Sequence, residues 1–320
     1  MNQLLKYILV VLFLALGCEL TTAQDDAQSP TVADVAKAGR EQRAHKVSAA
    51  ITQMQSPVRS VRETGLQDLL EILFHDSQDS NGLADGLKSF FARNPEIADV
   101  VRTGLIQSLV DENRRIWDLK SSARNPGVTP TPEPESAEAE GTEDDFYPTV
   151  IELVAALDDE RAIPALVGAI PTGGMAQGGL LKYGQKALNP VLEQLSNPDP
   201  LMRSEALAFG VTILLKENDP AARARITELV QSGLRDQEFL VRMAAIRSIE
   251  RIDDRDSFVP ELRELAEHDP LNIPESGAAY DYPVRREAIR ALHMIANHEW
   301  RGKDAGPSSN SGDVVPVESH

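Results

Sequence analysis

Apolar and small residues recur in the same order around four arginines of the chain. Each arginine follows an aliphatic residue, has a small residue three positions later and a branched aliphatic residue after that. The four copies are Val61-Arg62 with Gly65-Leu66, Met202-Arg203 with Ala206-Leu207, Val241-Arg242 with Ala245-Ile246, and Val284-Arg285 with Ala288-Ile289. These positions share one stripe of an α-helix, with a small residue where a neighbouring helix approaches closely. The pattern therefore predicts four related amphipathic helices.

The distances between these arginines along the chain indicate how the helices are arranged. Arg203 and Arg242 are 39 residues apart, and Arg242 and Arg285 are 43 apart. Such steps match the period of solenoids built from helix pairs. A further, less regular copy is expected around Val101-Arg102. We therefore expect about six or seven stacked helix pairs.

Short apolar stretches that contain a proline precede two of these helices, and a related stretch surrounds Pro164. The other two prolines are Pro190 and Pro260. Each is expected near the start of the first helix of a pair, where its missing N–H costs little. Residues 222–233 are expected to take the same place without a proline. The predicted alternation is a first helix, a turn, and a second helix that carries the arginine.

Composition narrows the class of partner. The chain of 320 residues is 42% hydrophobic but only 5% aromatic, which favours helices packed through small residues over sheets. Its net charge of −18 argues against nucleic acid, because phosphates would be repelled. The acidity would keep an exposed solenoid soluble. The alternative is a basic protein or a divalent cation as partner.

The segment from Leu180 to Leu192, followed by Asp199-Pro200-Leu201-Met202-Arg203, resembles HEAT repeats, including the short variety of phycobilin-lyase-like proteins. The resemblance is good over 147–300 and weaker over 32–120. It implies an all-α, right-handed α-solenoid of helix pairs. Because HEAT arrays are binding scaffolds with unrelated partners, the resemblance supports the fold more than any one function.

The same resemblance implies an inter-repeat ladder of aspartates and arginines. Asp236 before Arg242, and Asp281 before Arg285, match the family pattern. On physical grounds, Arg203, Arg242 and Arg285 should point between stacked repeats, where an aspartate of a turn accepts their forked donors. The alternative role for these arginines is direct contact with a ligand.

The two ends of the chain are expected to lie outside the folded array. Residues 1–23 have the build of a signal peptide, with Lys6 ahead of the apolar stretch 7–16 and a mature start at Gln24. A competing interpretation is lipidation of Cys18, which follows Gly17 as in bacterial lipoproteins. Either interpretation predicts an exported protein, periplasmic or secreted, that meets a membrane only if Cys18 is lipidated. Residues 301–320 are expected to be a disordered tail.

Between the two helical segments, 121–146 is expected to be a disordered acidic, proline-rich linker. The stretch 125–145 holds four prolines, seven acidic residues and no basic residue. Such a stretch has little to bury and repels itself. It is either a spacer or an acidic peptide presented to a partner.

No catalytic, cofactor-binding or metal-binding set emerges. The six histidines are scattered, and the single His-Glu pair, His298-Glu299, contrasts with the several pairs of iron-binding HEAT enzymes. The best candidate site is the loop 268–283, where Tyr280, Asp281 and Tyr282 would contact a partner protein. The alternative is that both tyrosine rings pack beneath the loop.

These features favour an exported HEAT-repeat scaffold that mediates protein–protein interaction, has no catalytic activity and needs no cofactor. The alternatives are an envelope-tethered structural lipoprotein and, last, a lyase or hydroxylase of the repeat type.

Overall fold

A computed structural model describes residues 31–74, 82–124, 146–217, 219–274 and 280–297. The chain divides into two compact units, 1–44 and 45–320. In the first unit the described residues are the N-terminal part of helix α2 (Val32–Met54), where most described side chains are exposed. The predicted signal peptide, Cys18, the centre of the predicted linker and the predicted tail lie outside the described residues.

The described part of the second unit is helical apart from one short hairpin. Strand β1 (Ile273–Pro274) pairs antiparallel with β2 (Tyr280–Asp281), Ile273 opposite Asp281. The α-helices that follow α2 are α3 (Arg59–Phe74), α4 (Leu83–Arg93), α5 (Pro95–Arg124), α6 (Phe146–Ala155), α7 (Ile163–Gly168), α8 (Gly174–Leu181), α9 (Gln185–Glu193), α10 (Pro200–Glu217), α11 (Pro220–Leu234), α12 (Phe239–Ile249), α13 (Val259–His268) and α14 (Pro283–Ala296). Short 3-10 helices are η1 (Glu160–Ala162), η2 (Ile170–Thr172), η3 (Gln194–Ser196) and η4 (Asp256–Phe258). The predicted all-α class is confirmed.

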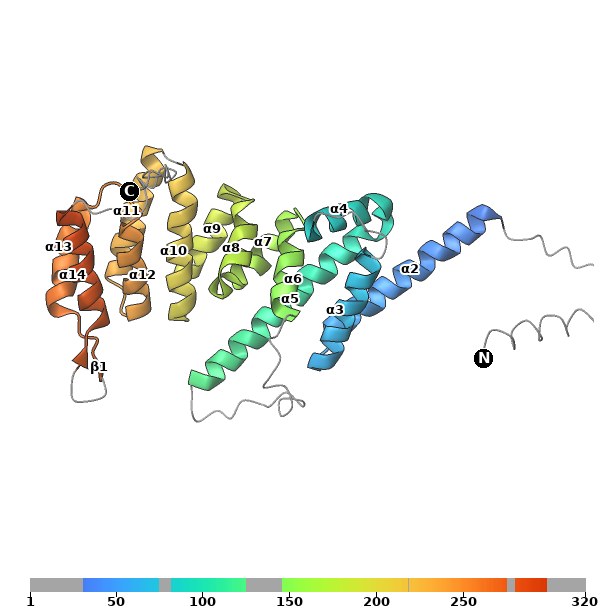
Figure 1. Cartoon of the computed structure of the whole chain (residues 1–320), viewed down its shortest axis with the longest axis horizontal. Helices are drawn as coiled ribbons and strands as arrows, with labels where there is room; N and C mark the ends of the chain where they lie inside the picture. Colours follow the sequence, from blue (N-terminus) through green and yellow to red (C-terminus); the bar gives the residue numbers. More distant parts are fainter. Residues whose placement is uncertain (1–30, 75–81, 125–145, 218, 275–279, 298–320) are drawn as a thin grey trace, which may run out of the picture. The chain divides into compact units, whose positions relative to one another are not determined.

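Helices of the C-terminal half pack in chain order, as an α-solenoid requires. Helix α10 packs against α9, α11 and α12, and α12 packs in turn against α11 and α14, which lies on α13 (Figure 1). The second helix of each pair thus lies beside the second helix of the next. This arrangement is compatible with the predicted solenoid.

The apolar stripe of the repeated motif forms much of the core. Leu207, Ala245 and Ile246 are at most 1% exposed. Ile289 was expected to be buried like Ile246, but it is 49% exposed. Helix α14 is the last helix of the described chain, so no described helix pair stacks on this side chain.

Small residues sit where helices approach closely, as predicted. A Cβ atom on Gly65 of α3 would lie 2.7 Å from the carbonyl oxygen of Ala50 and the amide nitrogen of Met54. A methyl group there would meet backbone rather than a movable side chain. Glycine at this position is therefore a requirement of the packing between α3 and α2.

The helices on either side of 125–145 pack directly on one another, which the sequence left open. Helix α5 lies against α6 and α7. The Tyr147 hydroxyl of α6 donates to Asn113 Oδ1 of α5 at 2.5 Å, and Asn113 Nδ2 donates to the Ala165 carbonyl of α7 at 2.8 Å. Burial and the nearby Glu112 carboxylate raise the pKa of the Tyr147 hydroxyl. The two segments therefore share one buried polar junction.

Three predicted boundaries are wrong in detail. Pro190 lies inside α9 and not near its start. Helix α11, expected to lack a proline, begins at Pro220, and the Asp219 side chain caps it by accepting from the Ala222 amide. Helix α5 continues to Arg124 and α6 begins at Phe146, so both ends of the predicted linker 121–146 are helical.

Candidate binding surfaces

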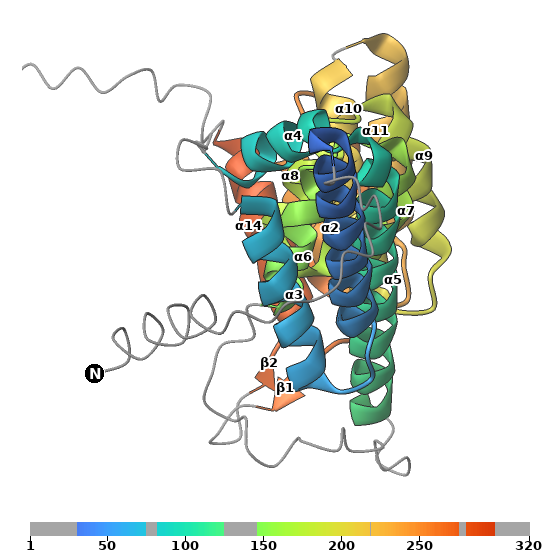
Figure 2. The same ribbon diagram turned by 90° about the vertical axis from the view of Figure 1, so that its right-hand side faces the viewer.

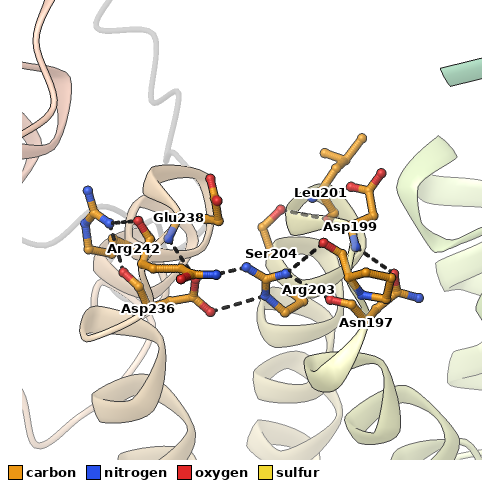
Figure 3. A network of polar contacts seen from close by, with 10 residues as sticks. Asn197, Asp199, Leu201, Arg203, Ser204, Asp236, Glu238 and Arg242 are labelled. Atoms are coloured by element: carbon orange, nitrogen blue, oxygen red, sulfur yellow. Dashed lines mark hydrogen bonds and ion pairs between the residues drawn. The ribbon is translucent and has the colours of Figure 1, made fainter. Parts of the chain in front are cut away.

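Arg203, in the first turn of α10, joins the turn before its own helix to the turn of the next pair. Its Nη1 donates to the carbonyls of Asn197 and Pro198 at 2.9 and 3.2 Å. Its Nε and Nη2 donate to the carboxylate of Asp236, at 3.2 and 3.1 Å (Figure 3). Two consecutive turns are thus held by one guanidinium group.

Asp236 is a shared acceptor in this network. Its carboxylate also accepts the Glu238 amide at 2.8 Å, and its backbone carbonyl accepts Arg242 Nη1 at 2.8 Å (Figure 3). Burial raises the pKa of the Asp236 carboxyl, but the hydrogen bonds from Arg203 and Glu238 outweigh it and hold the pKa below its usual value. Asp236 is therefore an ionised part of the packing.

Arg242 repeats these contacts one helix pair later. Its Nη1 also donates to the Gln237 carbonyl, and its Nε and Nη2 donate to the Asp269 carboxylate at 2.6 and 3.2 Å. The side chains of Arg242 and Asp269 are 8% and 1% exposed. Asp269 is not among the ladder residues expected from the sequence. The tripeptide Asp269-Pro270-Leu271 repeats Asp199-Pro200-Leu201, and in both the aspartate accepts the leucine amide, so this repetition was the available clue.

Arg285 departs from the pattern because the β1–β2 hairpin precedes it. Its Nε donates to the backbone carbonyl of Asp269 at 2.7 Å, and its guanidinium lies 4.5 Å from the centre of the Tyr282 ring. Tyr282 is thus half-buried under an arginine of its own chain. Tyr280 and Asp281 form β2. Their side chains lie outside what the structure describes, so the pairing of Asp281 with Arg285 stays a prediction.

The hairpin extends beyond the N-terminal end of α14 in both views (Figures 1 and 2). Its backbone is fixed by the pairing of Pro274 with Tyr280. The predicted partner-binding loop is therefore an ordered hairpin at its base. Residues 275–279 at its tip lie outside the described residues.

A second surface, here called the B-helix face, consists of polar side chains on α10, α12 and α14 and on the turn that follows α12. Arg251 Nη1 donates to Thr212 Oγ1 at 2.9 Å, and Arg247 lies 3.4 Å from Glu287. Arg290 forms ion pairs with Glu250 and Glu287. Three of these contacts, Arg251–Thr212, Arg247–Glu287 and Arg290–Glu250, join residues 39 or 40 positions apart in the chain. That separation is the length of one helix pair. Each helix is therefore tied laterally to the next along this face.

Electrostatic environments differ between members of this face. Hydrogen bonds from Arg290 hold the pKa of the Glu287 carboxyl below its usual value. Partial desolvation by neighbouring atoms lowers the pKa of the Arg251 guanidinium, although the residue as a whole is exposed. On α10, burial raises the pKa of the Glu205 carboxyl, whose hydrogen bond from Gln177 Nε2 is long, at 3.4 Å. Arg251 and Glu205 are thus less well compensated than Glu287.

A third feature is a pocket of about 290 Å³ lined by leucines and charged side chains together, here called the leucine groove. Helix α10 contributes its floor, and α9 with η3 and α11 contribute its walls. Arg225 and Glu228 of α11 lie at its rim, and the Arg203–Asp236 pair closes one end. Its leucines are Leu192, Leu195, Leu207, Leu214 and Leu229. No local sequence pattern predicts this groove, because it depends on how the helices from α9 to α12 meet.

The described part of the chain holds no group of three or more His, Cys, Asp and Glu side chains placed to bind a metal ion. Among the described helices, none is long and apolar enough to cross a membrane. Comparisons with protein-family models, curated proteins and solved structures found no match.

Proposed function

We propose that this protein is an exported, HEAT-like scaffold that binds another protein through the B-helix face. The observation that carries the proposal is the set of lateral contacts between α10, α12 and α14. Arg247 and Arg251 are exposed, yet each is held by a residue of an adjacent helix. Charged groups held in advance lose less side-chain entropy when a partner binds.

The chemistry of this face favours a partner with acidic groups near exposed arginines and a basic group near Glu205. Arg251 has only a hydroxyl partner among the described residues, and Glu205 only an amide. Both would gain from an oppositely charged group. Complementary charges contribute mainly specificity and association rate.

The test is recovery of a partner from an envelope extract of the producing cells. We expect the wild-type protein to recover a defined partner, and the Arg247→Glu, Arg251→Glu double variant to lose it. Arg263→Glu is the matched control, because Arg263 is an exposed arginine of α13. Equal recovery by all three proteins, or no partner with the wild type, contradicts the proposal.

Export is proposed from residues 1–23 alone, and lipidation of Cys18 would make the protein an envelope-tethered lipoprotein. The observation that favours this second candidate is the Gly17-Cys18 step at the end of the apolar stretch. Mass spectrometry of the mature N-terminus separates the two. A chain that begins at Gln24 excludes lipidation, and an acylated Cys18 establishes tethering.

A further inference from the structure

The leucine groove is only partly open, because Leu207, Leu214 and Leu229 within it are at most 8% exposed. Leu192 and Leu195 of its first wall are only partly buried. On the floor, a Cβ atom on Gly210 would lie 3.0 Å from Leu192 Cδ2 and 3.4 Å from Leu229 Cδ2. The missing side chain thus lets leucines of both walls lean over α10. A short aliphatic segment fits such a surface better than a bulky aromatic one.

Charge at the rim restricts the occupant further. Arg225 is exposed, and no hydrogen bond or ion pair links it to another described residue. Glu228, one turn further along α11, lies at the same rim. An occupant fits this groove if it places an acidic group beside Arg225 and away from Glu228, and aliphatic side chains against the leucines.

We propose that the leucine groove binds residues 313–318 of the same chain, Asp-Val-Val-Pro-Val-Glu. This segment has the only cluster of aliphatic residues beyond Trp300, and an acidic residue stands at each end. No lysine or arginine follows Lys303. Pro316 favours an extended Val315, so Val315 and Val317 share one side of the segment.

The chain between α14 and this segment is long enough. Helices α10, α12 and α14 pack successively, so the axes of α10 and α14 are about 20 Å apart at roughly 10 Å for each step. From Asn297 to Asp313 the chain spans at most about 50 Å, at roughly 3.3 Å for each residue.

The C-terminal end of α14 and the rim arginine lie toward the same end of the helices. The arginines near the N-termini of α10 and α12 occupy successive steps of one ladder, so these helices run in parallel. Arg285 reaches the same ladder through the Asp269 carbonyl, which gives α14 the same direction. The C-terminal end of α14 therefore lies toward the end where α10 passes into α11, near Arg225.

The test measures binding of a fluorescent peptide of residues 307–320 to two forms of the full chain by anisotropy. One form is wild type, and the other carries Val315→Asp and Val317→Asp. We expect the second form to bind the peptide about 10-fold more tightly, because its own tail no longer competes. That factor assumes an effective tail concentration of about 1 mM and a peptide Kd of about 0.1 mM. Equal affinities, or no binding to the second form, overturn the proposal.

Surface variants in the double-aspartate background then locate the site. We expect Arg225→Glu to weaken peptide binding at least 5-fold and Arg263→Glu to leave it unchanged. If Ile289→Asp abolished binding while Arg225→Glu did not, the peptide would occupy the exposed end of α14 and the proposal would fail. Sedimentation of the wild-type chain gives a second check: a dimer that the double-aspartate change abolishes would assign the tail to another copy, which also overturns the proposal. None of these variants alters the B-helix face, so failure here leaves the proposed function untouched.

Discussion

Two regions of this molecule are held together by different kinds of polar contact. Between α10 and the turn after α13, one arrangement occurs twice, as Arg203 with Asp236 and Arg242 with Asp269. At the junction of α5, α6 and α7, the contacts through Asn113 have no counterpart in the described C-terminal helices. The repeated Arg–Asp contacts hold the equivalent helix pairs of the C-terminal region in register. Where α6 interrupts the alternation of pairs, the contacts of Asn113 take their place.

Arg62 of α3 links the two kinds of contact. Its Nη1 donates to the carbonyls of Ser56 and Pro57, six and five residues earlier, as Arg203 and Arg242 do in their own turns. Its charged partner is Glu112, in the middle of α5, at 3.4 Å. Arg62 thus keeps the contacts of the repeated arginines with the turn before their own helix. Its acidic partner, however, lies within a helix and not in the turn of the next pair.

Removal of one of the two repeated arginines, Arg203 or Arg242, should have the largest effect on stability. Arg242→Ala leaves the Asp269 carboxylate buried without its cation, and we expect a loss of about 3–5 kcal/mol in the free energy of unfolding. Arg203→Ala should cost about 1–2 kcal/mol, because the Asp236 side chain is 20% exposed whereas the Asp269 side chain is 1% exposed. Urea denaturation of both variants measures the difference. Equal losses in the two variants would show that burial of the aspartate does not determine the cost of removing its arginine.

A methyl group at a close helix contact should have the next largest effect. Gly65→Ala places a Cβ atom against the backbone of α2, and we expect a loss of about 1–3 kcal/mol. Gly178→Ala in α8 is the control, because a Cβ atom there meets nothing within 4 Å. We expect the control to be neutral or stabilising by up to about 1 kcal/mol. Thermal unfolding distinguishes them, and a neutral Gly65→Ala would disprove the close contact.

At the junction, Tyr147→Phe removes one donor from a buried acceptor. Asn113 Oδ1 is then left without the Tyr147 hydroxyl, and we expect a loss of about 1–2 kcal/mol in the free energy of unfolding. Tyr183→Phe in the C-terminal region should cost less, because the Tyr183 hydroxyl is less buried. Similar losses from both changes would mean that the junction is no more demanding than an ordinary surface contact.

The smallest effect is expected at Glu205, and it depends on pH. Burial raises its folded pKa, so ionisation of Glu205 destabilises the folded state as the pH rises above the unfolded pKa. Glu205→Gln should therefore stabilise the protein near pH 7, by less than about 0.5 kcal/mol because solvent screens the group. The gain should vanish below about pH 4. A gain independent of pH would assign the effect to something other than charge.

The sequence predicts features that depend on neighbouring residues, and it misses contacts between residues that lie far apart in the chain. Helices α3, α10, α12 and α14 follow from a local pattern of apolar and small residues around an arginine. The partner of Arg242 was missed because Asp269 follows it by 27 residues, whereas Asp236 follows Arg203 by 33. The contact of Asn113 with Ala165 crosses 52 residues and leaves no periodic trace.

The candidate sites show the same division. The sequence selected Tyr280, Asp281 and Tyr282 from their place in a long loop. It did not predict the hairpin or the contact of Tyr282 with Arg285, because both depend on how the loop folds back on α14. The leucine groove involves side chains from four α-helices, α9 to α12, whose relative rotation no local pattern specifies.

The sharing of Asp236 between two arginines has a consequence for how the array opens. The Asp236 carboxylate binds Arg203 of the preceding helix pair. Its backbone carbonyl binds Arg242 of α12, the helix that follows this turn. Loosening this single turn therefore releases contacts on both sides of it. Neighbouring pairs should fray together rather than one at a time, so slow amide exchange with solvent should be lost over blocks of the chain larger than one repeat.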